Sequence, residues 1–282
     1  MIGIDEDGND FQISSIQTMF EGFYPRNITI FELFSVLICM LTGYPAITKQ
    51  GDVKVFQLVY FFFRFTYNVG LGCLLTLQSK FHSFTNSLRQ YIEDDCQCKT
   101  HPLMTRFIHT LIQRGAPPDL TTTHYPTCFL SWLVFKHLEN FIMWTDGWSF
   151  CALAVRCWDT TRYFDPSSCS ILRGILLDVV GIALVLLNCS AKMNAVKIQG
   201  VYAWFYGDFF FRTRSSLLYS GIYRWIPHPM YTVGYSAYYG LAILSRSRTV
   251  LLTAIIGHTM QMGFLMFVEI PHMKRTYPSS TQ

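Results

Sequence analysis

The feature that most constrains this fold is a series of apolar blocks, each near the length of a membrane-crossing helix. The blocks cover residues 31–47, 53–77, 127–155, 171–188, 230–244 and 250–268, and polar or proline-containing stretches separate them. A helix needs roughly 20 mostly apolar residues to cross a bilayer, and it satisfies its own backbone there. The pattern predicts an all-α fold: a polytopic transmembrane helical bundle of about six spanning helices.

Composition supports a membrane protein and excludes several other classes. Hydrophobic residues make up 51% of the chain and charged residues 14%, against about 25% charged in soluble domains. The net charge is +4, with basic residues scattered between the blocks, so we expect no nucleic-acid partner. The cysteine spacing matches neither a zinc site nor a redox motif, so we expect no metal. The acidic first residues do not resemble a signal peptide, so the first spanning helix is expected to stay in the mature protein.

The blocks divide the chain into two expected regions. Residues 1–126 form an N-terminal membrane region with two spanning helices and a polar loop. Within that loop, residues 101–114 read as a short amphipathic helix. Residues 127–282 form the second region, which ends in a helical hairpin.

The C-terminal hairpin is the most informative element. Its two apolar blocks are separated only by residues 245–249, which forces an antiparallel pair. The start of the first arm and the end of the second must then lie on the same side of the membrane. His228 and Tyr231 are therefore expected to converge with Glu269 and His272.

Basic residues orient this hairpin. Arg212, Arg214 and Arg224 precede the first arm, and Lys274 and Arg275 follow the second. Only two arginines, at positions 246 and 248, lie in the turn. The positive-inside rule then places the convergent end in the cytosol. A plainer interpretation stays open for each residue alone, because histidine and glutamate at a membrane boundary are often only solvated.

Several motifs of the second region resemble one family. Residues 221–223, 227–231, 234–235 and 238–240 are similar to the methyltransferase core of phosphatidylethanolamine N-methyltransferases. The aromatic segment 202–211 precedes that core, as in the fungal-type enzyme, and residues 268–272 resemble the motif that closes it. The resemblance covers most of the chain and is strongest from residue 202 onward, with a single core. Two features differ from the small single-core members: isoleucine follows Glu269, and no glycine-x-glycine motif precedes the core.

The resemblance implies a function and its partners. It implies N-methylation of phosphatidylethanolamine in phosphatidylcholine biosynthesis, with S-adenosylmethionine as the cofactor. The protein would then be an integral membrane enzyme of the endoplasmic reticulum, with its active site facing the cytosol. Phosphatidylethanolamine and membrane lipid are the expected partners, and the oligomeric state is left open.

The implied chemistry assigns roles to individual residues. An alkylamine titrates near about 10.4, so a base or desolvation must make it neutral at pH 7. His228 is the first candidate base and His272 the second, because histidine titrates near about 6.5. Glu269 would orient the ammonium or bind the cofactor. The expected cofactor-binding residues are Tyr231, Gly234, Tyr239, Gly240 and Glu269, and the expected substrate-binding residues are Asp208, Arg212 and Tyr235.

Plainer roles and other functions remain open. The tyrosines are equally typical of interfacial anchors, Asp208 of a helix cap, and Arg212 of a solvated face. A membrane methyltransferase acting on another acceptor, such as a prenylcysteine carboxylate, fits the same general plan. A non-catalytic core that serves as a binding subunit is the third possibility.

Overall fold

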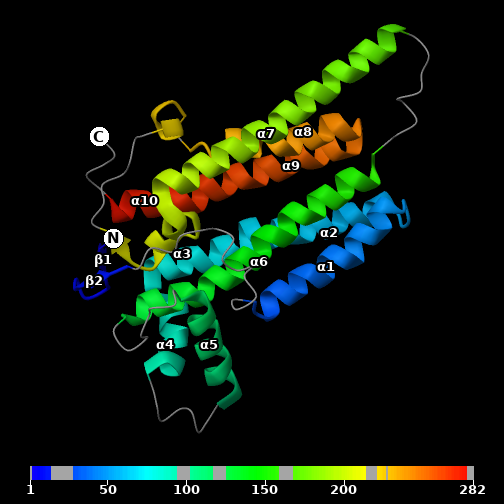
Figure 1. Cartoon of the computed structure of the whole chain (residues 1–282). Helices are drawn as coiled ribbons and strands as arrows, with labels where there is room; N and C mark the ends of the chain where they lie inside the picture. The colour runs from blue at the N-terminus through cyan, green and yellow to red at the C-terminus, as the bar shows by residue number, and fades with distance from the viewer. Residues whose placement is uncertain are drawn as a thin grey trace.

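The computed structural model describes residues 2–13, 28–93, 102–116, 125–158, 168–213, 221–226 and 228–277 (Figure 1). Side chains are described from residue 172 onward in the segment that begins at 168. Arg214 and Pro227, which were named in the sequence motifs, lie outside the described residues.

Helices dominate the described part of the chain. The α-helices are α1 (Ile30–Ile47), α2 (Val53–Phe65), α3 (Gly72–Phe81), α4 (Ser83–Glu93), α5 (Pro102–Gly115), α6 (Thr127–Arg156), α7 (Ser168–Trp204), α8 (Ser236–Ser245), α9 (Arg248–Phe264) and α10 (Ile270–Thr276). Two π-helical turns, η3 (Thr66–Leu71) and η10 (Leu265–Glu269), join α2 to α3 and α9 to α10. The 3-10 turns are η7 (Gly207–Phe209), η8 (Gly221–Arg224) and η9 (Val233–Tyr235).

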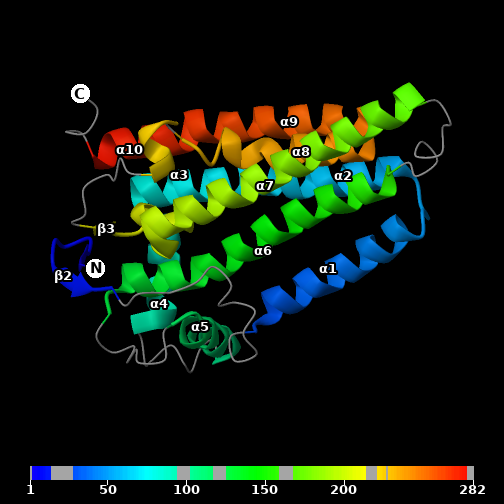
Figure 2. The same ribbon diagram turned by 45° about the horizontal axis from the view of Figure 1, so that its top comes forward.

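The long helices run alongside one another and form a bundle (Figure 2). Helix α6 lies inside it and packs against α1, α2, α4, α5 and α8. Its side chains are buried on nearly every face, including Trp132, Phe135 and Leu153. This burial explains why α6 combines an apolar composition with polar residues: neighbouring helices, and not lipid, surround it.

Four helices in the described part are long and apolar enough to cross a membrane: Ile30–Ile47, Val53–Phe81, Leu172–Phe209 and Arg248–Thr276. Large apolar side chains stand exposed along them, among them Leu33, Met40 and Leu41 on α1 and Leu172 and Leu176 on α7. Exposed apolar surface of this extent marks contact with another apolar phase. The chain is therefore a helical membrane protein, and a total of about six spans stays a prediction.

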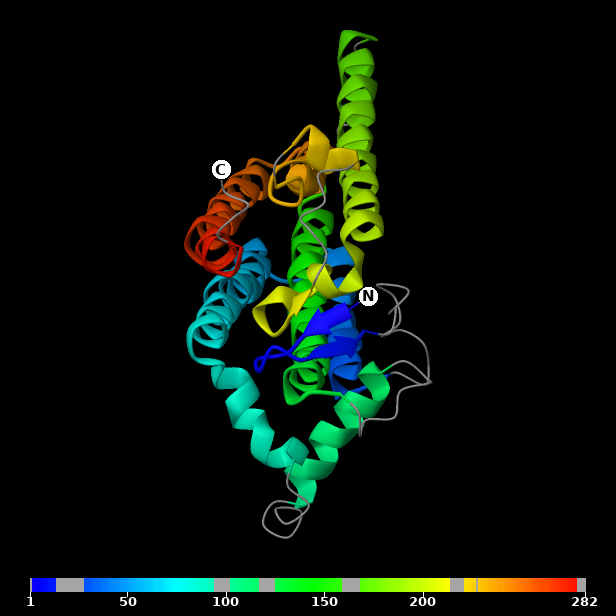
Figure 3. The same ribbon diagram turned by 90° about the vertical axis from the view of Figure 1, so that its left-hand side faces the viewer.

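One end of the bundle, here called the rim end, carries the remaining elements. Helix α10, the last turn of α7 and helix α5 lie there, with α5 running across the bundle direction (Figures 2 and 3). The amphipathic helix expected over residues 101–114 is confirmed as α5. Helix α4 was not expected, and it packs against α3, α5 and α6.

A small antiparallel sheet also lies at the rim end and departs from the all-α expectation. Its order is β2 (Asp10–Gln12), β1 (Ile2–Ile4) and β3 (Arg212–Thr213). Ile4 pairs with Arg212, so the N-terminal segment is tied to the chain just after α7. Strands this short carry no detectable alternating pattern, which is why the sequence did not reveal them.

Helices α7 and α8 cross at very short range. A Cβ atom added to Gly240 on α8 would lie 2.7 Å from the carbonyl oxygen of Gly181 on α7. Only a residue without a side chain permits this approach, which is typical of small residues at membrane helix contacts.

Candidate active site

The segment before α8 is a compact series of turns. His228 adopts the left-handed conformation with a φ of 57°. The backbone N–H of Tyr231 donates to the His228 carbonyl over 3.0 Å, and that of Gly234 donates to the Pro229 carbonyl over 2.7 Å. These bonds close the chain into turns, so the helix begins at Ser236 and not at Met230. The apolar block alone could not reveal these turns.

Tyr231 and Glu269 meet at the rim end of the bundle. The Tyr231 hydroxyl donates to a carboxylate oxygen of Glu269. Tyr231 is 6% exposed, and Glu269, the last residue of η10, is half-buried. The contact joins the segment around residue 231 to the segment around residue 269, in agreement with the convergence expected from the sequence.

His272 and Asp208 form a second contact at the same end. His272 is 3% exposed, and its Nε2 lies 3.4 Å from the Asp208 carboxylate. Its Nδ1 is 2.7 Å from the Ser79 hydroxyl. The imidazole stacks on Phe209 with ring centroids 3.7 Å apart. Partners on several sides fix this ring, and Ser79 on α3 was not found from the sequence.

His228 stands apart from this pair. It is exposed, and its ring lies edge-to-face with Tyr231 at a centroid distance of 6.5 Å. Desolvation by neighbouring protein atoms lowers the pKa of His228. The imidazole is therefore neutral at pH 7 and able to accept a proton.

His258 on α9 supports the turn segment from behind. Its Nε2 lies 2.9 Å from the Tyr231 carbonyl oxygen, and its Nδ1 lies 2.8 Å from the Tyr239 hydroxyl. Because a carbonyl only accepts, Nε2 carries the proton and Nδ1 accepts from Tyr239 in the neutral ring. His258 also stacks on Tyr235 at 4.4 Å. A histidine inside an apolar block was the available signal for this residue.

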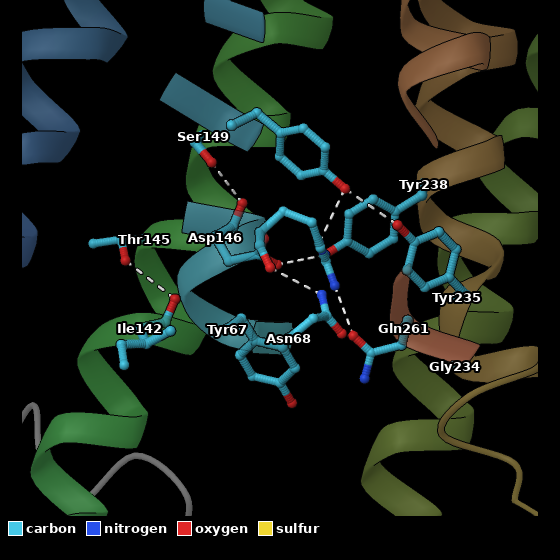
Figure 4. Close-up of polar contacts among 12 residues, drawn as sticks. Tyr67, Asn68, Ile142, Thr145, Asp146, Ser149, Gly234, Tyr235, Tyr238 and Gln261 are labelled. Carbon is cyan, nitrogen blue, oxygen red and sulfur yellow. Dashed lines mark hydrogen bonds and ion pairs between the residues drawn. The ribbon is translucent and has the colours of Figure 1, made fainter. Parts of the chain in front are cut away.

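Deeper in the bundle lies a polar network around Arg64, which we call the arginine network (Figure 4). The Arg64 guanidinium contacts Asp146 at 2.5 Å, Gln261 at 2.7 Å and the Tyr238 hydroxyl at 2.8 Å. Tyr235 stacks on Tyr238 with centroids 4.1 Å apart, which joins the network to the turn segment. Its side chains come from four helices: Arg64 from α2, Asp146 from α6, Tyr238 from α8 and Gln261 from α9.

The remaining residues predicted for the site, Gly234, Gly240 and Arg212, take no part in the two contacts at the rim end. The Gly234 carbonyl accepts from the Asn188 amide, and its N–H is bonded to Pro229. Gly240 faces α7 at the close crossing. Arg212 is exposed on β3. Tyr231, Glu269, Asp208 and His272 thus share the rim end, whereas Gly240 lies in a helix contact.

Comparison with known proteins shows which sequences this chain resembles. Residues 177–280 match the phospholipid methyltransferase family. The chain is 35% identical to a phosphatidylethanolamine N-methyltransferase of Aspergillus clavatus over 90% of this chain and 26% of the relative. It is 33% identical to one of Meyerozyma guilliermondii over 99% of this chain and 33% of the relative.

These relatives are longer proteins. The chain spans about a quarter to a third of the length of the curated relatives it matches. No solved structure matches it significantly. The resemblance to phosphatidylethanolamine N-methyltransferases is thereby confirmed.

Proposed function

We propose that this chain is a membrane methyltransferase that transfers methyl groups from S-adenosylmethionine to the amine of phosphatidylethanolamine, a reaction of phosphatidylcholine biosynthesis. Its similarity to enzymes of that name supports the reaction and the acceptor. The observation that carries the proposal is the hydrogen bond between Tyr231 and Glu269. It joins the two sequence motifs of the family at one end of a membrane bundle.

The residues at the rim end fit a cationic methyl donor. When bound, S-adenosylmethionine supplies an electrophilic methyl group on a positively charged sulfonium. A half-buried carboxylate beside phenol rings suits such a charge, and each aromatic face contributes about 0.5–2 kcal/mol. We therefore assign Glu269 and Tyr231 to the cofactor, and Tyr239, whose hydroxyl lies 2.8 Å from His258 Nδ1, stays a predicted contact. Gly234 and Gly240 stay predictions as cofactor contacts, because their backbones already face protein groups.

The acceptor amine must lose a proton before its nitrogen attacks the methyl carbon. His228 is neutral at pH 7, because desolvation lowers its pKa, and we assign it the role of base. His272, held by Asp208 and Ser79, is the second candidate. We assign Asp208, Arg212 and Tyr235 to the lipid, with the exposed Arg212 guanidinium suited to its phosphate.

We also propose the membrane arrangement. Helix α6, with 30 residues, is long enough to be a fifth crossing inside the four apolar spans. Residues 230–244, which include most of α8, would form the sixth, and α8 and α9 the hairpin. The rim end, with Lys274 and Arg275, would face the cytosol of the endoplasmic reticulum. Residues 1–126 would form the N-terminal region and residues 127–282 the methyltransferase core.

Expression in a host without its own lipid methyltransferases tests the function. Mass spectrometry of the phospholipids should find mono-, di- or trimethylated phosphatidylethanolamine. A Glu269→Gln variant, with equal membrane abundance, should lose at least about tenfold of the product, because a lost charged contact costs roughly 1.5–3 kcal/mol. Cofactor binding without any methylated lipid would contradict the proposal and favour another acceptor.

A further inference from the structure

Helix α5 is apolar over a wider face than its packing in the bundle uses. Leu111 and Ile112 are 2% and 1% exposed and belong to the face that packs on α4 and α6. Leu103, Met104 and Phe107 are also large and apolar, yet they are 81%, 50% and 39% exposed. Exposed apolar side chains gathered on one helix mark contact with a second apolar phase or partner.

The exposed residues of α5 divide into two flanks. At about 3.6 residues per turn, Leu103, Met104 and Phe107 fall within one arc of about 100° beside the buried face, and we call this arc the apolar flank. The exposed Arg106 and Gln113 lie outside it, on a separate polar flank. A helix with one face on protein, one apolar flank and one polar flank is typical of the boundary between a membrane and water.

The apolar flank adjoins the surface of α1. The Phe107 ring lies 6.4 Å from the ring of Phe31, the second residue of α1. Ile30 and Leu33, in the same first turn of α1, are 47% and 61% exposed. The apolar flank is therefore continuous with the surface that a membrane-crossing helix presents to lipid.

The level of α5 along the bundle matches one boundary of the hydrocarbon layer. Helix α1 has 18 residues, so it is about 27 Å long, close to the roughly 30 Å of that layer. His137 on α6 connects the start of α1 to α5: its Nδ1 lies 3.7 Å from the Glu32 carboxylate and its Nε2 lies 3.1 Å from the Leu111 carbonyl oxygen. At this level α5 runs across the direction of the long helices (Figures 2 and 3). It therefore runs along the plane of the membrane.

We propose that α5 is an interfacial helix whose apolar flank inserts into the leaflet at the rim end, at the boundary between phospholipid head groups and acyl chains. Arg114 lies on the same side in the last turn. Its long side chain can reach the lipid phosphates while its stem stays among apolar groups. Because α5 packs on α6, its insertion fixes the depth of the rim end relative to the head groups. This inference does not depend on the reaction that the protein catalyses.

The depth of single residues tests the proposal. Spin labels are attached to Leu103→Cys, Phe107→Cys, Arg106→Cys and Gln113→Cys variants of the full chain, in a background without native cysteines. The protein is reconstituted into vesicles of phosphatidylcholine and phosphatidylserine. Collisions with oxygen, which concentrates in the bilayer, are compared with collisions with a water-soluble nickel chelate. Labels 103 and 107 should meet mainly oxygen, at about 5–10 Å below the phosphates, and labels 106 and 113 mainly nickel.

A second pair of variants tests whether the apolar side chains cause the insertion. Leu103→Lys combined with Met104→Lys should move label 107 up to the phosphates or beyond, whereas Gln113→Lys on the polar flank is the matched control and should leave its depth unchanged. Equal nickel accessibility of labels 103, 106, 107 and 113 would overturn the proposal. Labels 103 and 107 that are shielded from both reagents would also overturn it, because protein and not lipid would then cover the apolar flank.

Discussion

Tyr231 and Glu269 lie far apart in sequence, and their hydrogen bond ties the turns before α8 to the end of η10. The same tyrosine is held by its backbone, because its carbonyl accepts from His258. Tyr231 is therefore held at two points along one continuous helix, Arg248–Thr276. A carboxylate fixed in this way is oriented before any ligand arrives, which lowers the cost of binding.

Replacing Tyr231 by phenylalanine should leave the fold intact and weaken binding of the methyl donor. The substitution removes only the hydroxyl that orients Glu269, a charged hydrogen bond worth roughly 1.5–3 kcal/mol. Titration of the purified variant with S-adenosylmethionine should show about a tenfold or greater rise in Kd. Tyr44→Phe on the exposed face of α1 is the control and should bind normally. Equal affinity in both variants would show that Tyr231 does not act through Glu269.

Residues at the rim end differ in how far sequence alone could place them. The meeting of Tyr231 with Glu269 was predictable, because a short connection between two apolar blocks brings their outer ends together. The partners Ser79 and His258 were not, since each comes from a helix whose rotation depends on tertiary packing. A histidine inside an apolar block was the only signal for His258.

At the scale of elements, the crossing of α7 and α8 decides where the turn segment lies. Gly240 and Gly181 bring the two backbones together, and the Asn188 amide on α7 then reaches the Gly234 carbonyl. The sequence suggested that Gly240 allows a close backbone approach, but it could not say whether a helix or a cofactor makes that approach.

Gly240→Ala should destabilise the protein by about 1–3 kcal/mol, the usual effect of overpacking. The new Cβ would lie 2.7 Å from the Gly181 carbonyl oxygen, so the helices must separate. Thermal unfolding in detergent measures the effect. Gly263→Ala is the control, because nothing lies within 4 Å of its added Cβ. Normal stability of Gly240→Ala with weakened cofactor binding would instead indicate a direct cofactor contact.

At the scale of the whole molecule, apolar periodicity indicated a membrane bundle, and the described residues include four helices long and apolar enough to span a membrane. The start of α8 and the small sheet were not predictable. Turns made by local hydrogen bonds and strands of two or three residues leave no period in the sequence. Helix α6 was detected as one long apolar block, yet its central position follows only from packing.

The two ends of the bundle should be accessible from opposite sides of the membrane. Helix α10 lies at the rim end, and helix α2 begins at the other end (Figure 1). Lys274 belongs to α10, and Lys54 is the second residue of α2. Single cysteines at these positions, in a background without native cysteines, are labelled with a membrane-impermeant maleimide in sealed microsomes. Cysteine 274 should react from outside, on the cytosolic face, and cysteine 54 only after the membrane is opened. Labelling of both from one side would exclude this arrangement.

The π-helical turns η3 and η10 each add one extra residue to one of two neighbouring long helices, near the same level of the bundle. Each extra residue turns everything beyond it by about 100° relative to an uninterrupted α-helix. Tyr67 belongs to one turn and Glu269 to the other, while Ser79 and His272 lie beyond them. The orientation of these side chains therefore depends on a π-helical turn in each of two neighbouring helices. A helix that lost its π-helical turn would direct lipid-facing residues toward its neighbour.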